Sequence, residues 1–158
     1  MKTVRMIKLH PNTEEKKHLD DLMRVFSSMK RYAFNRLLEG QSVGYLNKTM
    51  PAKFKVNKRY AEDAVLLAQS IITSQQELLP QRIEDTEAKI QKTERKIHDY
   101  QTGRKTPKVV DLETCLKGLG KRAEKLQAKL YDLQQHQENS TIPTVIFGGR
   151  KNFIERRK

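Results

Sequence analysis

One face of the first long helical segment carries the side chains best suited to chemistry with phosphate groups. Within residues 13–39, a polar stripe recurs at helical spacing opposite the apolar side chains and consists of Lys17, Arg24, Ser28, Arg31 and Asn35. An arginine presents a rigid fork of donors that matches phosphate oxygens and guanine edges, and asparagine can bridge bases or backbone. The stripe predicts contact with nucleic acid. The alternative is a solvated helix face, the usual role of charged residues on helices.

Aromatic and basic side chains are interleaved along the chain after residue 31. The aromatic residues are Tyr32, Phe34, Tyr45 and Phe54, and the basic residues selected among them are Arg36, Lys53, Lys55 and Arg59. Aromatic rings can stack on bases while neighbouring cations neutralise phosphates, so we expect these four cations to extend the same surface. Phe34 also suits a core position.

No group of side chains in the sequence predicts catalysis. The four histidines, at positions 10, 18, 98 and 136, are too scattered to form a ligand pair on one helical turn, and Cys115 has no histidine nearby. Adjacent carboxylates such as Asp20 and Asp21 lack the strand context of a two-metal site, and there is no glycine-rich phosphate loop. We therefore expect no enzyme, no catalytic residue, no metal ligand and no cofactor in this chain.

The composition favours a basic, helical, intracellular protein. The 158 residues carry 32 Lys and Arg against 19 Asp and Glu, a net charge of +13, and only 36% are hydrophobic. Residues 1–60 hold 14 basic and 5 acidic side chains, so a polyanion is the expected partner. One cysteine and the lack of a long apolar run favour a soluble, cytoplasmic location without a membrane.

The elements that would position these side chains are mostly helices. Residues 3–9 and 141–146 are rich in β-branched residues and predict short terminal strands. Asn12 and Glu15 have capping-box spacing, which starts a helix over 13–39 that Gly40 ends. Residues 40–58 contain Gly and Pro and predict a loop or short helical turns, and a further helix extends from Tyr60 to Leu79.

Two apolar stripes then predict an antiparallel coiled-coil hairpin at about 81–136. Ile83, Ile90 and Ile97 are seven residues apart, and six leucines with Ala123 alternate at spacings of four and three from 112 to 133. The polar segment between them would form the tip, where Arg104 and Lys105 could reach a phosphate backbone. The expected fold class is therefore mainly α, with a long helical hairpin and short strands at both termini.

Four segments, in order, resemble the N-terminal region of the TnpB-type proteins of bacterial insertion sequences, relatives of the type V CRISPR effectors. They are IKLHPNTEEKKHLDDL (7–22), MKRYAFNRLLEG (29–40), RYAEDAVLLAQSIITSQQELLP (59–80) and PTVIFGGRKNFIERR (143–157). The resemblance implies a split wedge domain, β-barrel-like, from 1–11 and 141–158, and a helical recognition domain over 12–140. It also adds Arg150 and Lys151 to the binding residues.

The same resemblance implies an RNA-guided DNA endonuclease encoded beside a transposase, with guide RNA and target DNA as partners. Its RuvC-type acidic site and divalent metal would lie in a C-terminal half, so we expect this chain to be a binding portion of a longer protein. Two alternatives remain: a coiled-coil interaction module that self-associates through the hairpin, and a small basic DNA-binding regulator.

Overall fold

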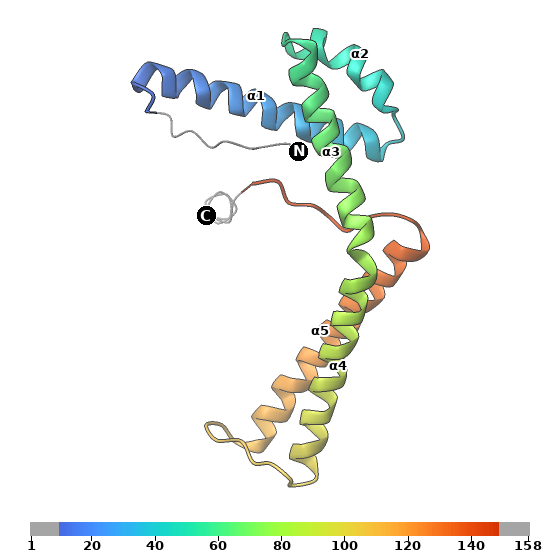
Figure 1. Ribbon diagram of the computed structural model, residues 1–158. Helices are drawn as coiled ribbons and strands as arrows, with labels where there is room; N and C mark the ends of the chain where they lie inside the picture. The colour runs from blue at the N-terminus through green and yellow to red at the C-terminus, as the bar shows by residue number, and fades with distance from the viewer. Residues whose placement is uncertain (1–9, 149–158) are drawn as a thin grey trace, which may run out of the picture. The chain divides into compact units, whose positions relative to one another are not determined.

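The computed structural model describes residues 10–148 and consists of helices joined by short connections (Figure 1). The helices are α1 (Thr13–Leu38), α2 (Val43–Phe54), α3 (Lys58–Glu77), α4 (Leu79–Gln101) and α5 (Leu112–Glu138). Two compact units divide within α3, between Ile71 and Ile72. The expected mainly helical class is confirmed.

The start of α1 is fixed by the predicted capping box. The backbone N–H of Glu15 donates to Asn12 Oδ1 at 2.9 Å, and the N–H of Asn12 donates to Glu15 Oε2 at 2.8 Å. These two bonds satisfy donors that a helix start leaves without partners. At the other end, Gly40 has a φ of +87°, which its missing side chain permits, and the helix ends there as predicted.

The first unit has a small core formed by α1, α2 and α3. Its buried side chains are Met29, Ala33, Phe34, Leu46, Met50, Ala61, Ala64, Val65 and Ala68. The three alanines on α3 add little side-chain bulk between the helices. The backbones can therefore approach closely around the two methionines. Phe34 is in this core, which agrees with its alternative interpretation from sequence.

Tyr60 connects α3 to the middle of α1. Its hydroxyl donates to the carbonyl oxygen of Leu22 at 2.8 Å, and its ring lies 5.2 Å from that of Phe26. Burial raises the pKa of Tyr60, so the hydroxyl stays protonated and remains a donor. This contact fixes α3 against the turn of α1 that carries Arg24.

The segment 40–58 differs from its prediction because most of it forms α2. Ser42 caps the helix, accepting from the N–H of Tyr45 at 3.2 Å, and Leu46 and Met50 are buried one turn apart. Pro51 lies inside the helix near its end, where the lost backbone bond affects only the last turn. Burial of these two side chains therefore outweighs the breakers Gly44 and Pro51.

The first three turns of α1 do not pack as predicted within the described residues. Leu19, Leu22 and Met23 belong to the expected apolar face, yet they are 43%, 47% and 59% exposed. The amphipathic spacing is correct, but the packing of α2 and α3 begins only near Phe26. Helical spacing predicts which side is apolar, and it cannot predict where a neighbouring helix ends.

The second unit contains the predicted antiparallel hairpin, in which α4 and α5 pack along their lengths (Figure 1). Pro80 is in the first turn of α4 and therefore opens a new helix. Ile90 and Leu133 are buried in the seam together with Thr86 and Thr93. Each threonine hydroxyl donates to the carbonyl four residues earlier at 2.7 Å, which satisfies the buried polar group.

The terminal strands have different outcomes. Residues 3–9 lie outside the described range, as do 149–158, and 141–146 contain no strand, so that prediction is wrong. Thr141 instead closes α5, since its N–H donates to the carbonyl of His136 at 2.9 Å. A strand needs a neighbour to accept its ladder bonds, and no strand is present in residues 10–148. Pro143 further removes one donor.

Two methionines provide a matched test of this packing. Met29 is fully buried and Met23 is 59% exposed on the same helix. We expect Met29→Ala to lower the free energy of unfolding by about 2–5 kcal/mol, and Met23→Ala to change it by less than about 0.5 kcal/mol. Urea denaturation followed by circular dichroism measures both. Equal midpoints for the two variants would contradict the assigned core.

Candidate nucleic-acid interface

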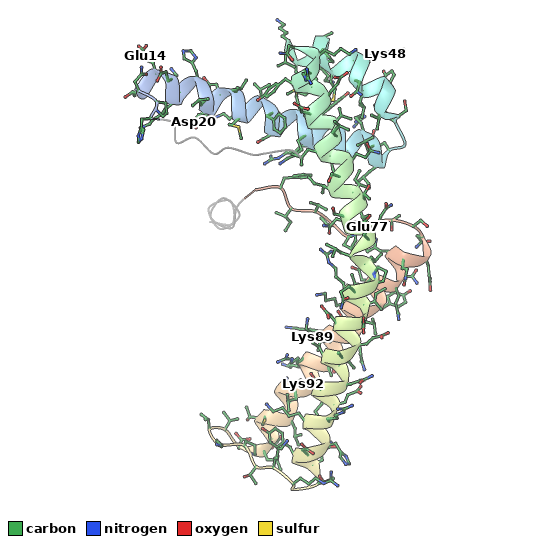
Figure 2. All side chains as sticks on the ribbon, in the orientation of Figure 1. Glu14, Asp20, Lys48, Glu77, Lys89 and Lys92 are labelled. Carbon is green, nitrogen blue, oxygen red and sulfur yellow. The ribbon has the colours of Figure 1, made fainter. Side chains whose placement is uncertain are left out.

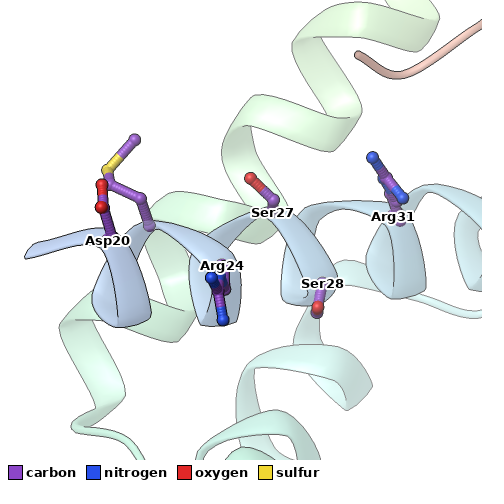
Figure 3. A pocket seen from close by; sticks show the side chains of 6 residues that line it. Asp20, Arg24, Ser27, Ser28 and Arg31 are labelled. Carbon is purple, nitrogen blue, oxygen red and sulfur yellow. The ribbon is translucent and has the colours of Figure 1, made fainter. Parts of the chain in front are cut away.

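The polar stripe on α1 is largely exposed in the first unit. Lys17, Arg24, Ser28 and Asn35 are exposed, and Arg31 is half-buried. Arg24, Ser28 and Arg31 line one open hollow of about 520 Å³ with Asp20, Met23 and Ser27, all from α1 (Figure 3). The structure therefore brings the central three predicted residues to one place, with Lys17 and Asn35 beyond the hollow at either end.

Two arginines of the predicted set have carboxylates close to them. Arg24 Nη1 lies 3.6 Å from Asp21 Oδ1, and Arg36 Nη2 lies 2.7 Å from Glu39 Oε1. Both pairs join residues three apart on one helix, and all four side chains are at least one-third exposed. Such pairs contribute about 0–1 kcal/mol, so a phosphate can replace the carboxylate at little cost.

A second group of predicted side chains surrounds the ring of Tyr32. Lys53 Nζ lies 4.3 Å from the ring centroid, and Arg36 Cζ lies 5.5 Å from it. Phe54 contacts the same ring edge-on, with centroids 5.7 Å apart. Cations are attracted to an aromatic face, so Tyr32 holds the charges of α1 and α2 next to each other. The predicted interleaving of aromatics and cations is thus a physical cluster here.

Charge in this part of the chain is almost entirely of one sign. Between Arg24 and Arg59 there are nine basic residues and one acidic residue, Glu39. Lys55 and Arg59 are exposed at the connection from α2 to α3, and Lys55 adopts a left-handed backbone with a φ of 52°. Tyr45 is 55% exposed on α2. Among its described residues, the first unit therefore presents a basic surface that includes the exposed ring of Tyr45.

The hairpin tip uses one of its two predicted cations for its own structure. Lys105 Nζ lies 2.7 Å from Asp99 Oδ2, and the N–H of Lys105 donates to the carbonyl of Asp99 at 3.1 Å. The bond from Lys105 lowers the pKa of Asp99, and the same bond raises the pKa of Lys105. Arg104 is exposed at the tip. Lys105 thus holds the loop against α4.

Arg150 and Lys151 lie outside the described residues. Sequence reasoning missed Met23 and Ser27 as neighbours of the arginines in the hollow, although Ser27 is three residues from Arg24 and four from Arg31, and Met23 is four residues from Ser27.

In residues 10–148 there is no group of three or more His, Cys, Asp or Glu side chains placed to hold a metal ion. Over the same range, none of the helices combines the length and the apolar character that a membrane crossing requires.

Comparison with known proteins gives a family. A model of the SSO2105 N-terminal domain matches residues 3–111, which is more than half of the chain. No curated protein and no solved structure matches the sequence. The matched range includes α1, α2, α3 and α4, and therefore the whole basic surface of the first unit. This chain belongs to the SSO2105 N-terminal domain family.

Proposed function

We propose that this chain binds RNA or an RNA–DNA hybrid through the basic surface of its first unit. The observation that carries the proposal is the charge of residues 24–59, which include nine basic residues and one acidic residue. Like charges repel when they are crowded on a small unit, so the surface gains free energy when a polyanion neutralises it. Contacts to phosphate supply most of the affinity of proteins that bind nucleic acid without reading its sequence.

The α1 stripe fits the shape of a phosphate backbone. Arg24 and Arg31 are seven residues apart, two helical turns, and the intervening rise is about 10 Å. Phosphates follow one another at about 3.4 Å along each strand of a duplex, so the two guanidinium groups can reach different phosphates of one strand. Ser28 lies between them and can donate its hydroxyl to a phosphate oxygen.

The contacts around Tyr32 restrict the basic side chains before a ligand binds. Lys53 and Arg36 are long side chains that lose rotamer freedom when they bind a ligand. Their contacts with the Tyr32 ring already restrict them, so less entropy is lost on binding. Tyr45, which is exposed, offers a face on which an unpaired base can stack.

Four segments of the sequence support a proposal about the protein to which this chain belongs. We place the chain as the N-terminal binding portion of a TnpB-like, RNA-guided DNA endonuclease, with guide RNA and target DNA as the partners. Support comes from the four resembling segments; the second of them, residues 29–40, contains Arg31, Asn35 and Arg36 in the last turns of α1. Base identity would be read by pairing, as in other RNA-guided effectors, and the present residues would hold the backbone.

The alternative role is a coiled-coil interaction module. It is favoured by the leucines of α5, most of which are only half-buried in the two-helix seam, including Leu116, Leu126 and Leu130. A second copy could cover them. Sedimentation would then give a mass that rises with concentration, and Leu126→Glu with Leu130→Glu would abolish the increase.

Binding to RNA should depend steeply on salt. If about six phosphates are neutralised, a fourfold rise in salt lowers the affinity about a thousandfold. We expect Arg24→Ala to weaken binding to a fluorescein-labelled structured RNA and to lower the salt slope by about 1. Fluorescence anisotropy titrations at several salt concentrations measure both quantities.

Lys16→Ala is the matched control. Lys16 is also an exposed cation of α1, but it is outside the stripe and follows Glu14 and Glu15. Its loss should leave the salt slope nearly unchanged. Equal effects of the two variants, or no binding by the wild-type chain at micromolar concentration and low salt, would contradict the proposal.

Lys55 links stability to binding. Its left-handed backbone is unfavourable for a residue with a side chain, so Lys55→Gly should increase the free energy of unfolding by up to about 1 kcal/mol. The same variant should bind RNA more weakly because a cation is lost. Lys55→Ala keeps a side chain at the left-handed position. It should weaken RNA binding as much as Lys55→Gly does, without increasing the free energy of unfolding. Urea denaturation measures the change in stability, and anisotropy measures the change in RNA affinity. An unchanged RNA affinity in Lys55→Ala would show that Lys55 does not belong to the RNA-binding surface.

A further inference from the structure

The hairpin of the second unit carries most of its lysines on one flank and most of its glutamates on the other; Asp85 and Asp132, which precede the seam residues Thr86 and Leu133, lie on the flank of the lysines. On α4, Lys89, Lys92 and Lys96 each come one residue before a seam residue, namely Ile90, Thr93 and Ile97. Glu87 and Glu94 instead follow Thr86 and Thr93 by one residue. One residue turns a helix by about 100°, so the lysines and the glutamates lie on opposite sides of the seam. Figure 2 marks Lys89 and Lys92 on α4.

Helix α5 repeats the pattern of α4. Arg122, Lys125 and Lys129 each come one residue before a seam residue, namely Ala123, Leu126 and Leu130. In two antiparallel helices whose seams face each other, positions that precede the seam fall on the same face of the pair. The three cations of α4 and the three of α5 therefore share one face of the hairpin, here called the basic hairpin face.

The register of the hairpin places the two rows next to each other. Leu79 and His136 line the same hollow. Ten residues after Leu79 is Lys89, and ten residues before His136 is Leu126, so Lys89 lies near the level of Lys125. By the same count Lys92 lies near Ala123 and next to Arg122. Lys89 and Lys92 thus have a cation of α5 opposite them across the seam, whereas Lys96 lies at the level of Leu119 and Lys129 lies near Asp85.

Repulsion among these cations lowers the stability of the isolated hairpin. Positions that face each other beside an antiparallel seam usually carry opposite charges, which attract. Here all six side chains are basic and exposed, and within residues 10–148 none of them forms an ion pair with a carboxylate. Lys92 and Lys96 also line a hollow of about 570 Å³ with Arg95 and with the ion pair of Lys105 and Asp99, so its charged lining has a net positive charge.

We propose that the basic hairpin face is a second contact surface for the sugar-phosphate backbone of a nucleic acid. Charge complementarity favours this occupant, since each row spans about 10 Å, the length of about three successive phosphates in one strand. Five of the six cations are lysines, which act as point charges and read no base sequence. The inference uses the polymer of the proposed function and assigns it to residues that do not belong to the first unit.

The test replaces one row and keeps the fold. In the full chain, Lys89→Gln, Lys92→Gln and Lys96→Gln remove three charges with little change in helix propensity. Anisotropy titration against a labelled RNA duplex of about 20 base pairs should show a salt slope lower by about 2 to 3 and an affinity lower by at least tenfold at low salt. The triple variant should also unfold at a higher urea concentration in low salt, because repulsion across the seam is relieved.

The matched control removes three cations outside this face, with Lys108→Gln, Lys117→Gln and Lys121→Gln. It should lower the salt slope by less than about 1. An equal loss in control and test variants would overturn the inference, because net charge alone would then explain binding. An unchanged slope in the test variant, with a lowered slope in Arg24→Ala, would overturn it and leave the proposed function intact.

A further outcome concerns the occupant of the face. If the wild-type chain forms dimers in sedimentation and the triple variant does not, the basic hairpin face binds the acidic flank of a second copy, and the proposal of a nucleic-acid contact is overturned. A monomer in both cases, together with the lowered salt slope, supports the nucleic-acid contact.

Discussion

Repulsion among crowded cations is the constraint on which the other features of this protein depend. Nine basic residues face one acidic residue between Arg24 and Arg59, and six more cations share one face of the α4–α5 hairpin. The weak ion pairs of Arg24 and Arg36 remove little of this repulsion. A small core must therefore hold the helices while their surfaces repel, and an external polyanion would relieve that strain.

The core of the first unit meets this demand with few side chains. Met29, Leu46 and Met50 are fully buried, and the alanines of α3 let the helices approach closely. Tyr60 adds a hydrogen bond to the backbone of α1 at Leu22, two residues before Arg24. The basic stripe thus lies on a helix that is fixed from its opposite side. The cations stay exposed because the apolar side chains of α1 take up its contacts with α2 and α3.

Local patterns in the sequence predicted the features that depend on near neighbours. The capping box at Asn12, the end of α1 at Gly40 and the antiparallel hairpin follow from spacing alone. Helix α2 was missed because Gly44 and Pro51 suggest a loop, whereas burial of Leu46 and Met50 depends on distant residues. The strand expected at 141–146 failed for the same reason, since a strand depends on a partner that spacing cannot supply.

In the candidate site too, the sequence predicted contacts within one helix but not contacts between elements. Helical spacing placed Arg24, Ser28 and Arg31 on one face, and the structure puts them around one hollow. The contact of Lys53 with Tyr32 joins two helices, and the bond of Lys105 to Asp99 closes a loop; no sequence interval indicates either contact. The row of cations across the hairpin was overlooked because its meaning depends on the antiparallel register of α4 and α5.

A nuclear magnetic resonance titration of the isotope-labelled chain with an RNA duplex tests the central claim most directly. Backbone amide signals report which residues meet the polymer. Our account predicts shifts that are concentrated at the α1 stripe, at the cations of α2 and at the start of α3, and that disappear at high salt. Shifts restricted to the leucine seam of α5, or none at low salt, would contradict it.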